Sequence, residues 1–154
     1  MAWRLTREFA GRLALCVGLW SALPLATARA DDVASAVAAL PAELSGVQLM
    51  GSWKDGATSG VYRLIVSRVG SPANERLFVQ WLAVDRTGKS RVVDSAEVEE
   101  FASLGTTITG TRSKTEADAL LVFIDTAGAA GSGPSGYELI LGPPAEYRFA
   151  PFSN

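Results

Sequence analysis

The sequence predicts an α+β domain built mainly on an antiparallel β-sheet of about seven strands, with a short N-terminal helix and one inserted helix near residues 95–104. Three observations lead to this fold class. From Val47 onward, runs of β-branched, aromatic and aliphatic residues alternate with turns rich in glycine and proline. Only two segments have helical spacing instead. The chain after an N-terminal export signal has the size of one ordinary domain.

The first 30 residues are typical of a cleavable secretory signal. Three arginines lie among the first twelve residues, an apolar run extends from Leu13 to Leu25, and Ala28-Arg29-Ala30 has the small-x-small form of a cleavage site. We therefore expect cleavage after Ala30, a single mature domain over 31–154, and a periplasmic or secreted location. The apolar run is shorter than the ~20 residues of a membrane span, so the cleaved protein is not expected to be a transmembrane protein. A retained N-terminal anchor is the alternative.

Composition excludes several classes of function. Residues 31–154 carry ten Lys/Arg against fifteen Asp/Glu, a net charge of −5, whereas a nucleic-acid-binding protein needs a basic surface. Cys16 is the only cysteine and lies within the signal, and the chain contains no histidine. The mature domain therefore has no cysteine nucleophile, no histidine base, and only carboxylates as zinc ligands. We expect no cofactor, no metal and no enzymatic activity, with a carboxylate-based hydrolase as the remaining catalytic hypothesis.

The segment from Asp31 to Leu44 is predicted to be the N-terminal helix. An aspartate can cap its start, and Pro41 ends it. Its apolar residues are spaced to share one face: Val33, Val37 and Leu40. Because the segment is short and rich in alanine, we expect it to lie on the domain without organising it.

The remaining chain from Val47 onward contains the predicted strands. The first of them begins near Val47. The other six are Val61 to Val66, Leu77 to Val84, Thr106 to Thr111, Leu120 to Ile124, Tyr137 to Leu141 and Tyr147 to Phe149. Turn-forming segments separate them, including Gly70 to Glu75, the glycine-rich loop from Gly128 to Gly136, and Gly142-Pro143-Pro144. Three of the strands are apolar on both faces. We therefore expect a second layer over the sheet, made by helices or by the sheet folding on itself.

One segment within the strand region has a helical pattern. Asp94-Ser95-Ala96-Glu97 has the form of a capping box, and Gly105 stands where a helix commonly ends. These features predict a helix from Ser95 to Leu104. The alternative is a further strand of the meander.

A nucleotide-binding motif is suggested by Ala83 to Ser90 together with Leu120 to Asp125, which match loose forms of the two Walker sequences. A phosphate-binding loop needs its lysine on the first turn of a helix. Here Lys89-Ser90 leads into Arg91-Val92-Val93, which favours a strand. We interpret the segment as a charged hairpin turn.

A second pattern suggests ligand binding. Gly51-Ser52-Trp53, with Arg148 on the last predicted strand, resembles the Gly-x-Trp of calycin-type barrels such as lipocalins and some bacterial protease inhibitors. In those barrels the tryptophan packs beneath the barrel against a late arginine. The resemblance implies a carrier of small apolar ligands or a protease-inhibitor-like barrel. A core tryptophan after a turn glycine explains the same residues.

By elimination, the sequence predicts a small non-enzymatic domain that binds a protein or an envelope component. Its candidate partner or ligand contacts are Trp53, Tyr62, Trp81 and Arg148, although each aromatic residue also fits a core position. The alternatives differ in what the structure must contain. A carrier needs an enclosed apolar cavity, a binding module needs an accessible apolar surface, and a hydrolase needs two close carboxylates in a cleft.

Overall fold

The computed structural model describes residues 27–70, 74–117, 119–127 and 136–152, and the chain divides into two compact units, Met1–Ala39 and Leu40–Asn154. In the first unit, α1 (Thr27–Ala38) starts and ends earlier than the predicted N-terminal helix, and the predicted cleavage point lies within it. Residues 1–26 of the predicted signal and residues 128–135 of the predicted loop lie outside the described residues. No helix within the described part is long and apolar enough to cross a membrane.

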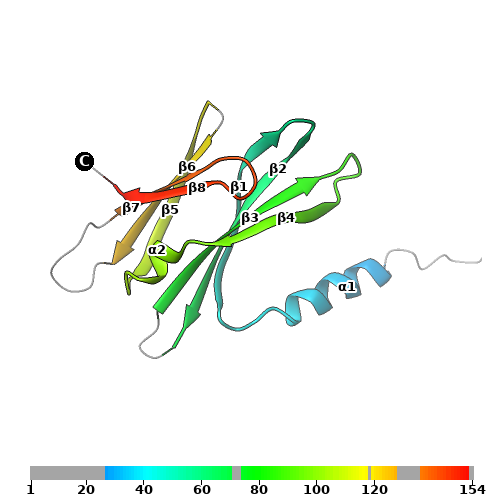
Figure 1. The fold of residues 1–154 in the computed structure, drawn as a ribbon. Coiled ribbons are helices and arrows are strands. Elements are labelled where there is room, and N and C mark those ends of the chain that lie inside the picture. The colour runs from blue at the N-terminus through cyan, green and yellow to red at the C-terminus, as the bar shows by residue number, and fades with distance from the viewer. Residues whose placement is uncertain (1–26, 71–73, 118, 128–135, 153–154) are drawn as a thin grey trace, which may run out of the picture. The chain divides into compact units, whose positions relative to one another are not determined.

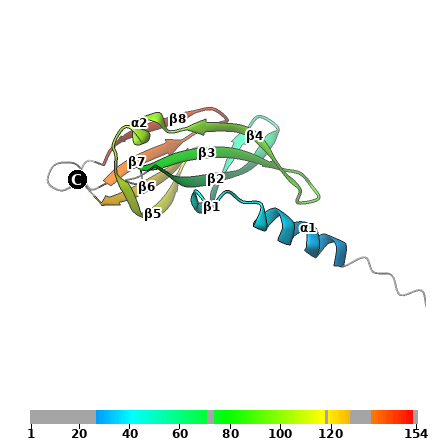
Figure 2. The ribbon, with the colours of Figure 1, turned by 90° about the horizontal axis from the view of Figure 1, so that it is seen from below.

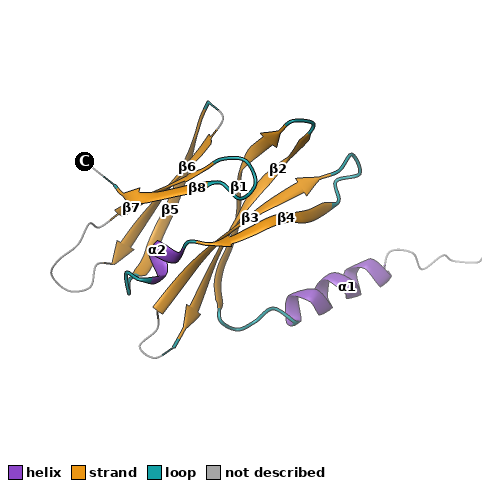
Figure 3. Ribbon diagram, viewed as in Figure 1, coloured by secondary structure: helices purple, strands orange, loops and turns teal. Residues whose placement is uncertain are grey.

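The second unit contains two four-stranded antiparallel sheets, which confirms the predicted fold class (Figures 1 and 3). Sheet A consists of β1 (Leu44–Asp55), β2 (Thr58–Val69), β3 (Asn74–Val84) and β4 (Ser90–Glu97). Sheet B consists of β5 (Thr107–Glu116), β6 (Ala119–Ala127), β7 (Gly136–Leu141) and β8 (Tyr147–Pro151). Neighbours in sequence are neighbours in each sheet, so each is a simple meander, and eight strands replace the expected seven.

The inner faces of the two sheets form one hydrophobic core (Figures 1 and 2). Buried and partly exposed residues alternate along β3, β6 and β7, as expected for strands with one face against a core. The fully buried side chains include Leu77, Val79, Trp81, Leu120, Val122, Ile124, Leu139 and Leu141. The predicted second layer is therefore present, and it is a second, separate sheet instead of helices or one sheet folded on itself.

The inserted helix is shorter than the sequence predicted. α2 spans only Glu99–Ala102, and it follows Val98 with no side-chain cap. Ser95 and Glu97 lie in β4, opposite Gln80 and Phe78 of β3. The predicted capping box does not form because pairing with β3 provides this segment with a full ladder of backbone hydrogen bonds, which outweighs the local helical preference.

Two buried aromatic side chains link the sheets through hydrogen bonds. The single proton of the Tyr62 hydroxyl of β2 is shared between the carbonyls of Leu141 and Gly142, whose oxygens lie 3.2 and 3.0 Å away. The Trp81 indole N–H of β3 donates to the Gly142 carbonyl at 2.9 Å. The two rings meet edge to face, with centroids 6.3 Å apart. Burial raises the pKa of Tyr62 to about 12, so its hydroxyl remains a donor at alkaline pH values where an exposed tyrosine ionises.

A bulge in β1 lets two large residues face the core. Met50 and Trp53 are both buried although three positions separate them, because the pairing with β2 shifts register between them. Gly51 lies in this bulge with φ of +48°, a conformation that favours glycine. An added Cβ there would also lie 2.6 Å from Cδ1 of Leu120.

Gly51→Ala is expected to lower the free energy of unfolding by about 2 kcal/mol, from backbone strain together with displacement of Leu120. Gly56→Ala is the matched control, since Gly56 has φ of +56° but open space around its Cβ position. The control should lose only about 1 kcal/mol. Urea denaturation measures the free energy of unfolding of both variants. Equal losses would mean that displacement of Leu120 does not contribute to the destabilisation by Gly51→Ala.

Candidate functional site

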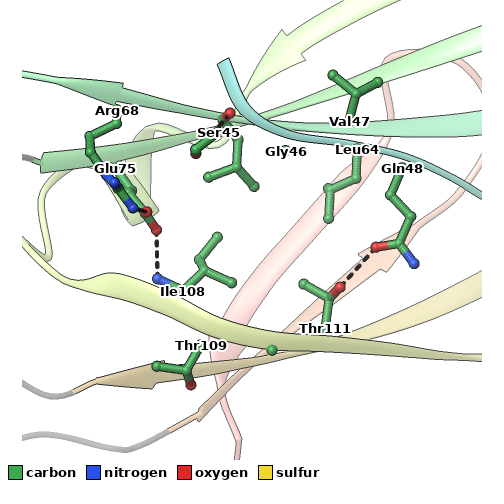
Figure 4. Close-up of a pocket in the computed structure, with 12 residues that line it drawn as sticks. Ser45, Gly46, Val47, Gln48, Leu64, Arg68, Glu75, Ile108, Thr109 and Thr111 are labelled. Carbon is green, nitrogen blue, oxygen red and sulfur yellow. Dashed lines mark hydrogen bonds and ion pairs between the residues drawn. The ribbon is translucent and has the colours of Figure 1, made fainter. Parts of the chain in front are cut away.

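An open groove of about 450 Å³ lies between β1 and β5, and it is the candidate site (Figure 4). β1 is an edge strand of sheet A, and β5 is an edge strand of sheet B. The groove is lined by Ser45 to Gln48 of β1, by Ile108 to Thr111 of β5, and by Leu64, Val66, Arg68 and Glu75 behind them. It therefore lies where the two sheets approach each other without joining into one ladder.

The floor of the groove is apolar, and its two long sides are strand edges. Leu64 is buried, while Val66 and Ile108 are partly buried and pack against the core. β1 pairs only with β2, and β5 pairs only with β6. Each strand therefore has backbone N–H and C=O groups on its outer edge that the sheets leave without ladder partners.

One end of the groove is defined by Glu75, the only charged residue among the buried side chains of the described chain. This carboxylate of β3 is 3% exposed. It accepts a hydrogen bond from the Arg68 guanidinium at 2.9 Å and another from the backbone N–H of Ile108 at 2.6 Å. The second bond runs from sheet A to the edge of sheet B, so Glu75 holds β5 in place beside the groove (Figure 4).

A bulge in β5 accompanies this bond. The pairing of β5 with β6 shifts register between Ile108 and Gly110, which leaves Thr109 as an extra residue. Next to this bulge, the Ile108 N–H donates its hydrogen bond to Glu75 of sheet A. The local geometry of β5 thus depends on Glu75, 33 residues earlier in the chain.

A second polar contact crosses the groove at its other end. The Thr111 hydroxyl of β5 lies 2.9 Å from Oε1 of Gln48 on β1 (Figure 4). The pair is exposed, so water can replace this bond at little cost in free energy. The groove is therefore held by a part-buried bond at the Glu75 end and by an exposed bond at the Gln48 end.

Three of the four residues predicted from sequence as contacts lie in the core. Trp53 is 4% exposed, and Tyr62 and Trp81 have no exposed surface. Trp53 donates its indole N–H to the carbonyl of Val61 at 3.2 Å, within its own hairpin. Their surroundings match the alternative interpretation of the three aromatics as core residues.

Arg148, the fourth predicted residue, is exposed on β8, while its neighbours Tyr147 and Phe149 pack against the core. Because successive side chains of a strand point to opposite faces, Arg148 lies on the outer face of sheet B. Trp53 is buried on the inner side of sheet A. The tryptophan–arginine packing that the calycin resemblance implies is therefore not formed.

The residues that define the groove were not among the sequence candidates. Glu75 falls at the end of the turn predicted for Gly70 to Glu75, but it is the second residue of β3. Its position contained a usable signal, because Glu75 shares the inward face of the strand with Leu77, Val79 and Trp81. An acid on the buried face of a strand needs a partner, and this one has two.

The charged groups of the groove are paired with each other, and the rest of its lining is uncharged. Both oxygens of Glu75 already accept hydrogen bonds, and no cluster of three or more metal-ligating side chains occurs among the described residues. What the groove offers is an apolar floor between two lines of backbone donors and acceptors. No protein-family model, curated protein or solved structure matches the chain.

Proposed function

We propose that the protein is an exported, non-enzymatic binding module that takes an extended segment of a partner protein into the groove between β1 and β5. The observation that carries this proposal is the pair of edge strands facing one groove, each paired on one side only. An extended peptide can add to such an edge through main-chain hydrogen bonds. Here β1 and β5 each offer one such edge, and a peptide strand would pair with one of the two.

The lining of the groove suits a strand with alternating side chains. In an extended peptide, every second side chain points to the same face. One set would contact the apolar floor formed by Leu64, Val66 and Ile108, and the other set would face solvent. We therefore expect the bound segment to carry aliphatic or β-branched residues at alternate positions, with polar residues between them.

The alternative functions fit the groove less well. A carrier of small apolar ligands needs an enclosed cavity, and this groove is open to solvent along the edge strands. A carboxylate-based hydrolase needs two free carboxylates in a cleft, whereas Glu75 is occupied by Arg68 and Ile108. The export signal predicted for residues 1–30 supports a partner in the periplasm or outside the cell.

A substitution at Gly46 tests the proposal directly. Gly46→Trp should fill the groove, because Gly46 is among its lining residues. Gly46→Ala is the matched control, since the added Cβ would lie 3.8 Å from Cβ of Val66, an ordinary contact that leaves the groove open. The probe is a peptide selected from a displayed library of ten-residue sequences, and its affinity is measured by fluorescence anisotropy. We expect Gly46→Trp to weaken binding at least about tenfold and Gly46→Ala to change it less than about twofold.

The location of binding is checked by amide hydrogen exchange. A peptide in the groove should slow exchange in β1 and β5 more than in β7. Three outcomes would contradict the proposal. Gly46→Trp and Gly46→Ala could bind the peptide equally well, protection from exchange could be confined to other strands, or no peptide in the library could bind. Circular dichroism of both variants verifies that the fold is retained.

A further inference from the structure

The charged hairpin that resembled a nucleotide-binding loop forms part of a second open hollow, of about 670 Å³. The turn between β3 and β4 supplies Asp85, Arg86 and Lys89, and Arg91 follows on β4. The hairpin between β1 and β2 supplies Ala57, Thr58 and Ser59. Both hairpins lie at the same end of sheet A, because Gly60 of β2 pairs with Ala83 of β3.

The charges that line this hollow are unbalanced. Arg86, Lys89 and Arg91 are exposed, and among the described residues none of them forms an ion pair. Four other cations do form ion pairs with acids: Arg68, Arg76, Arg112 and Lys114. Lys54, Arg63 and Arg148 also form no ion pair among the described residues. What distinguishes Arg86, Lys89 and Arg91 is that all three line one hollow, in a domain whose net charge is −5 from ten basic and fifteen acidic residues.

Asp85 is the only acid that lines the hollow, and its own turn engages it. Its Oδ1 accepts hydrogen bonds from the Thr87 N–H at 2.8 Å, the Thr87 hydroxyl at 2.6 Å and the Lys89 N–H at 3.0 Å. These bonds lower the pKa of Asp85, with the Thr87 hydroxyl as the largest cause. The carboxylate therefore holds the turn in shape and is not paired with the neighbouring basic side chains.

We infer that this hollow binds a phosphate-type oxyanion, held by Arg86, Lys89 and Arg91 together with the hydroxyls of Thr58 and Ser59. Guanidinium groups bind phosphate through two parallel hydrogen bonds, lysine adds a mobile positive charge, and the two hydroxyls are neutral donors. The inference is independent of the groove between β1 and β5, since the two sites share no lining residue. The same chemistry would accept a soluble phosphate or a phospholipid headgroup.

Two probes distinguish these sources. Calorimetric titration of the protein with inorganic pyrophosphate measures binding of a soluble anion. Co-sedimentation with vesicles of phosphatidylglycerol and phosphatidylcholine, against vesicles of phosphatidylcholine alone, measures binding to headgroups. The double variant Arg86→Gln/Arg91→Gln should weaken binding at least about tenfold. The matched control, Lys114→Gln/Arg148→Gln, removes the same charge from exposed positions of sheet B and should change binding less than about twofold.

A third variant tests the electrostatic argument with the opposite sign. Asp85→Asn keeps an oxygen that accepts the bonds from Thr87 and Lys89 but removes the negative charge, so binding should tighten by about two- to threefold. The site is supported if either probe binds most tightly to Asp85→Asn, about equally to the native protein and the control, and most weakly to Arg86→Gln/Arg91→Gln. The probe that binds then identifies the ligand as a soluble phosphate or a phospholipid headgroup. Failure of both probes to bind, or equal weakening by the two double variants, would overturn it.

Discussion

Trp81→Ala is expected to lower the free energy of unfolding by about 3–5 kcal/mol. The indole has no exposed surface, so its removal leaves a large cavity in the centre of the core. The substitution also removes the hydrogen bond to the Gly142 carbonyl and the edge-to-face contact with Tyr62. Because domains of this size are stable by about 5–15 kcal/mol in total, the variant should be only marginally folded. Urea denaturation followed by near-UV circular dichroism measures the loss.

Two milder substitutions separate the causes of that loss. Trp81→Phe keeps most of the buried apolar surface but removes the donor to Gly142, and it should cost about 1–2 kcal/mol. Tyr62→Phe also removes a donor to Gly142 while the ring stays in place, so a similar cost is expected. A loss below about 1 kcal/mol for Trp81→Ala would contradict the assignment of this residue to the centre of the core.

The strands that could be predicted from the sequence are those that their own local composition marks as strands. Val61 to Val66, Leu77 to Val84 and Leu120 to Ile124 lie within β2, β3 and β6. Long runs of β-branched and aromatic residues fit few other structures. The expectation of a second layer was also correct, because strands with apolar residues on the buried face need a cover. Local composition cannot say that the cover is a second meander of the same chain.

The inserted helix was overestimated because its local signals compete with partners distant in sequence. Ser95 receives a hydrogen bond from the Gln80 side chain at 3.2 Å, and Glu97 forms an ion pair with Arg76. These partners lie 15 and 21 residues earlier in the chain. A capping-box pattern is read from four adjacent residues, so it contains no information about a strand that can pair with the same segment. Only Glu99–Ala102, which follows the last residue paired with β3, becomes helical.

The groove could not be predicted because it is made by residues that only the folded chain brings together. Gln48 and Thr111 are 63 positions apart, and Glu75 and Ile108 are 33 positions apart. The aromatic residues chosen from the sequence were reasonable binding candidates by type, but large aromatics are also the residues that fill a core. Trp53, Tyr62 and Trp81 are buried, so the accessible lining of the groove consists of smaller residues, mostly on the edge strands.

The second large effect is expected at Glu75. Glu75→Leu should lower the free energy of unfolding by about 2–4 kcal/mol, because the Ile108 N–H loses its acceptor and Arg68 loses its counterion. Glu75→Gln should cost less, about 1–2 kcal/mol, since the amide oxygen can still accept from Ile108. Asp125→Asn removes an exposed partner of Arg112 and serves as the control, with an expected change within about 0.5 kcal/mol.

Comparing the stability lost by Glu75→Leu and by Glu75→Gln separates the contribution of the hydrogen bond to Ile108 from that of the negative charge. Both Glu75 substitutions remove the charge, but only Glu75→Leu removes the acceptor that holds β5 to β3. Amide exchange at Ile108 should therefore accelerate at least about tenfold in Glu75→Leu and much less in Glu75→Gln. If both variants lost equal stability and equal protection at Ile108, the ion pair with Arg68 would be the stabilising contact. In that case β5 would be held by packing alone, and the Glu75 end of the groove would be as free to open as the end closed by Gln48 and Thr111.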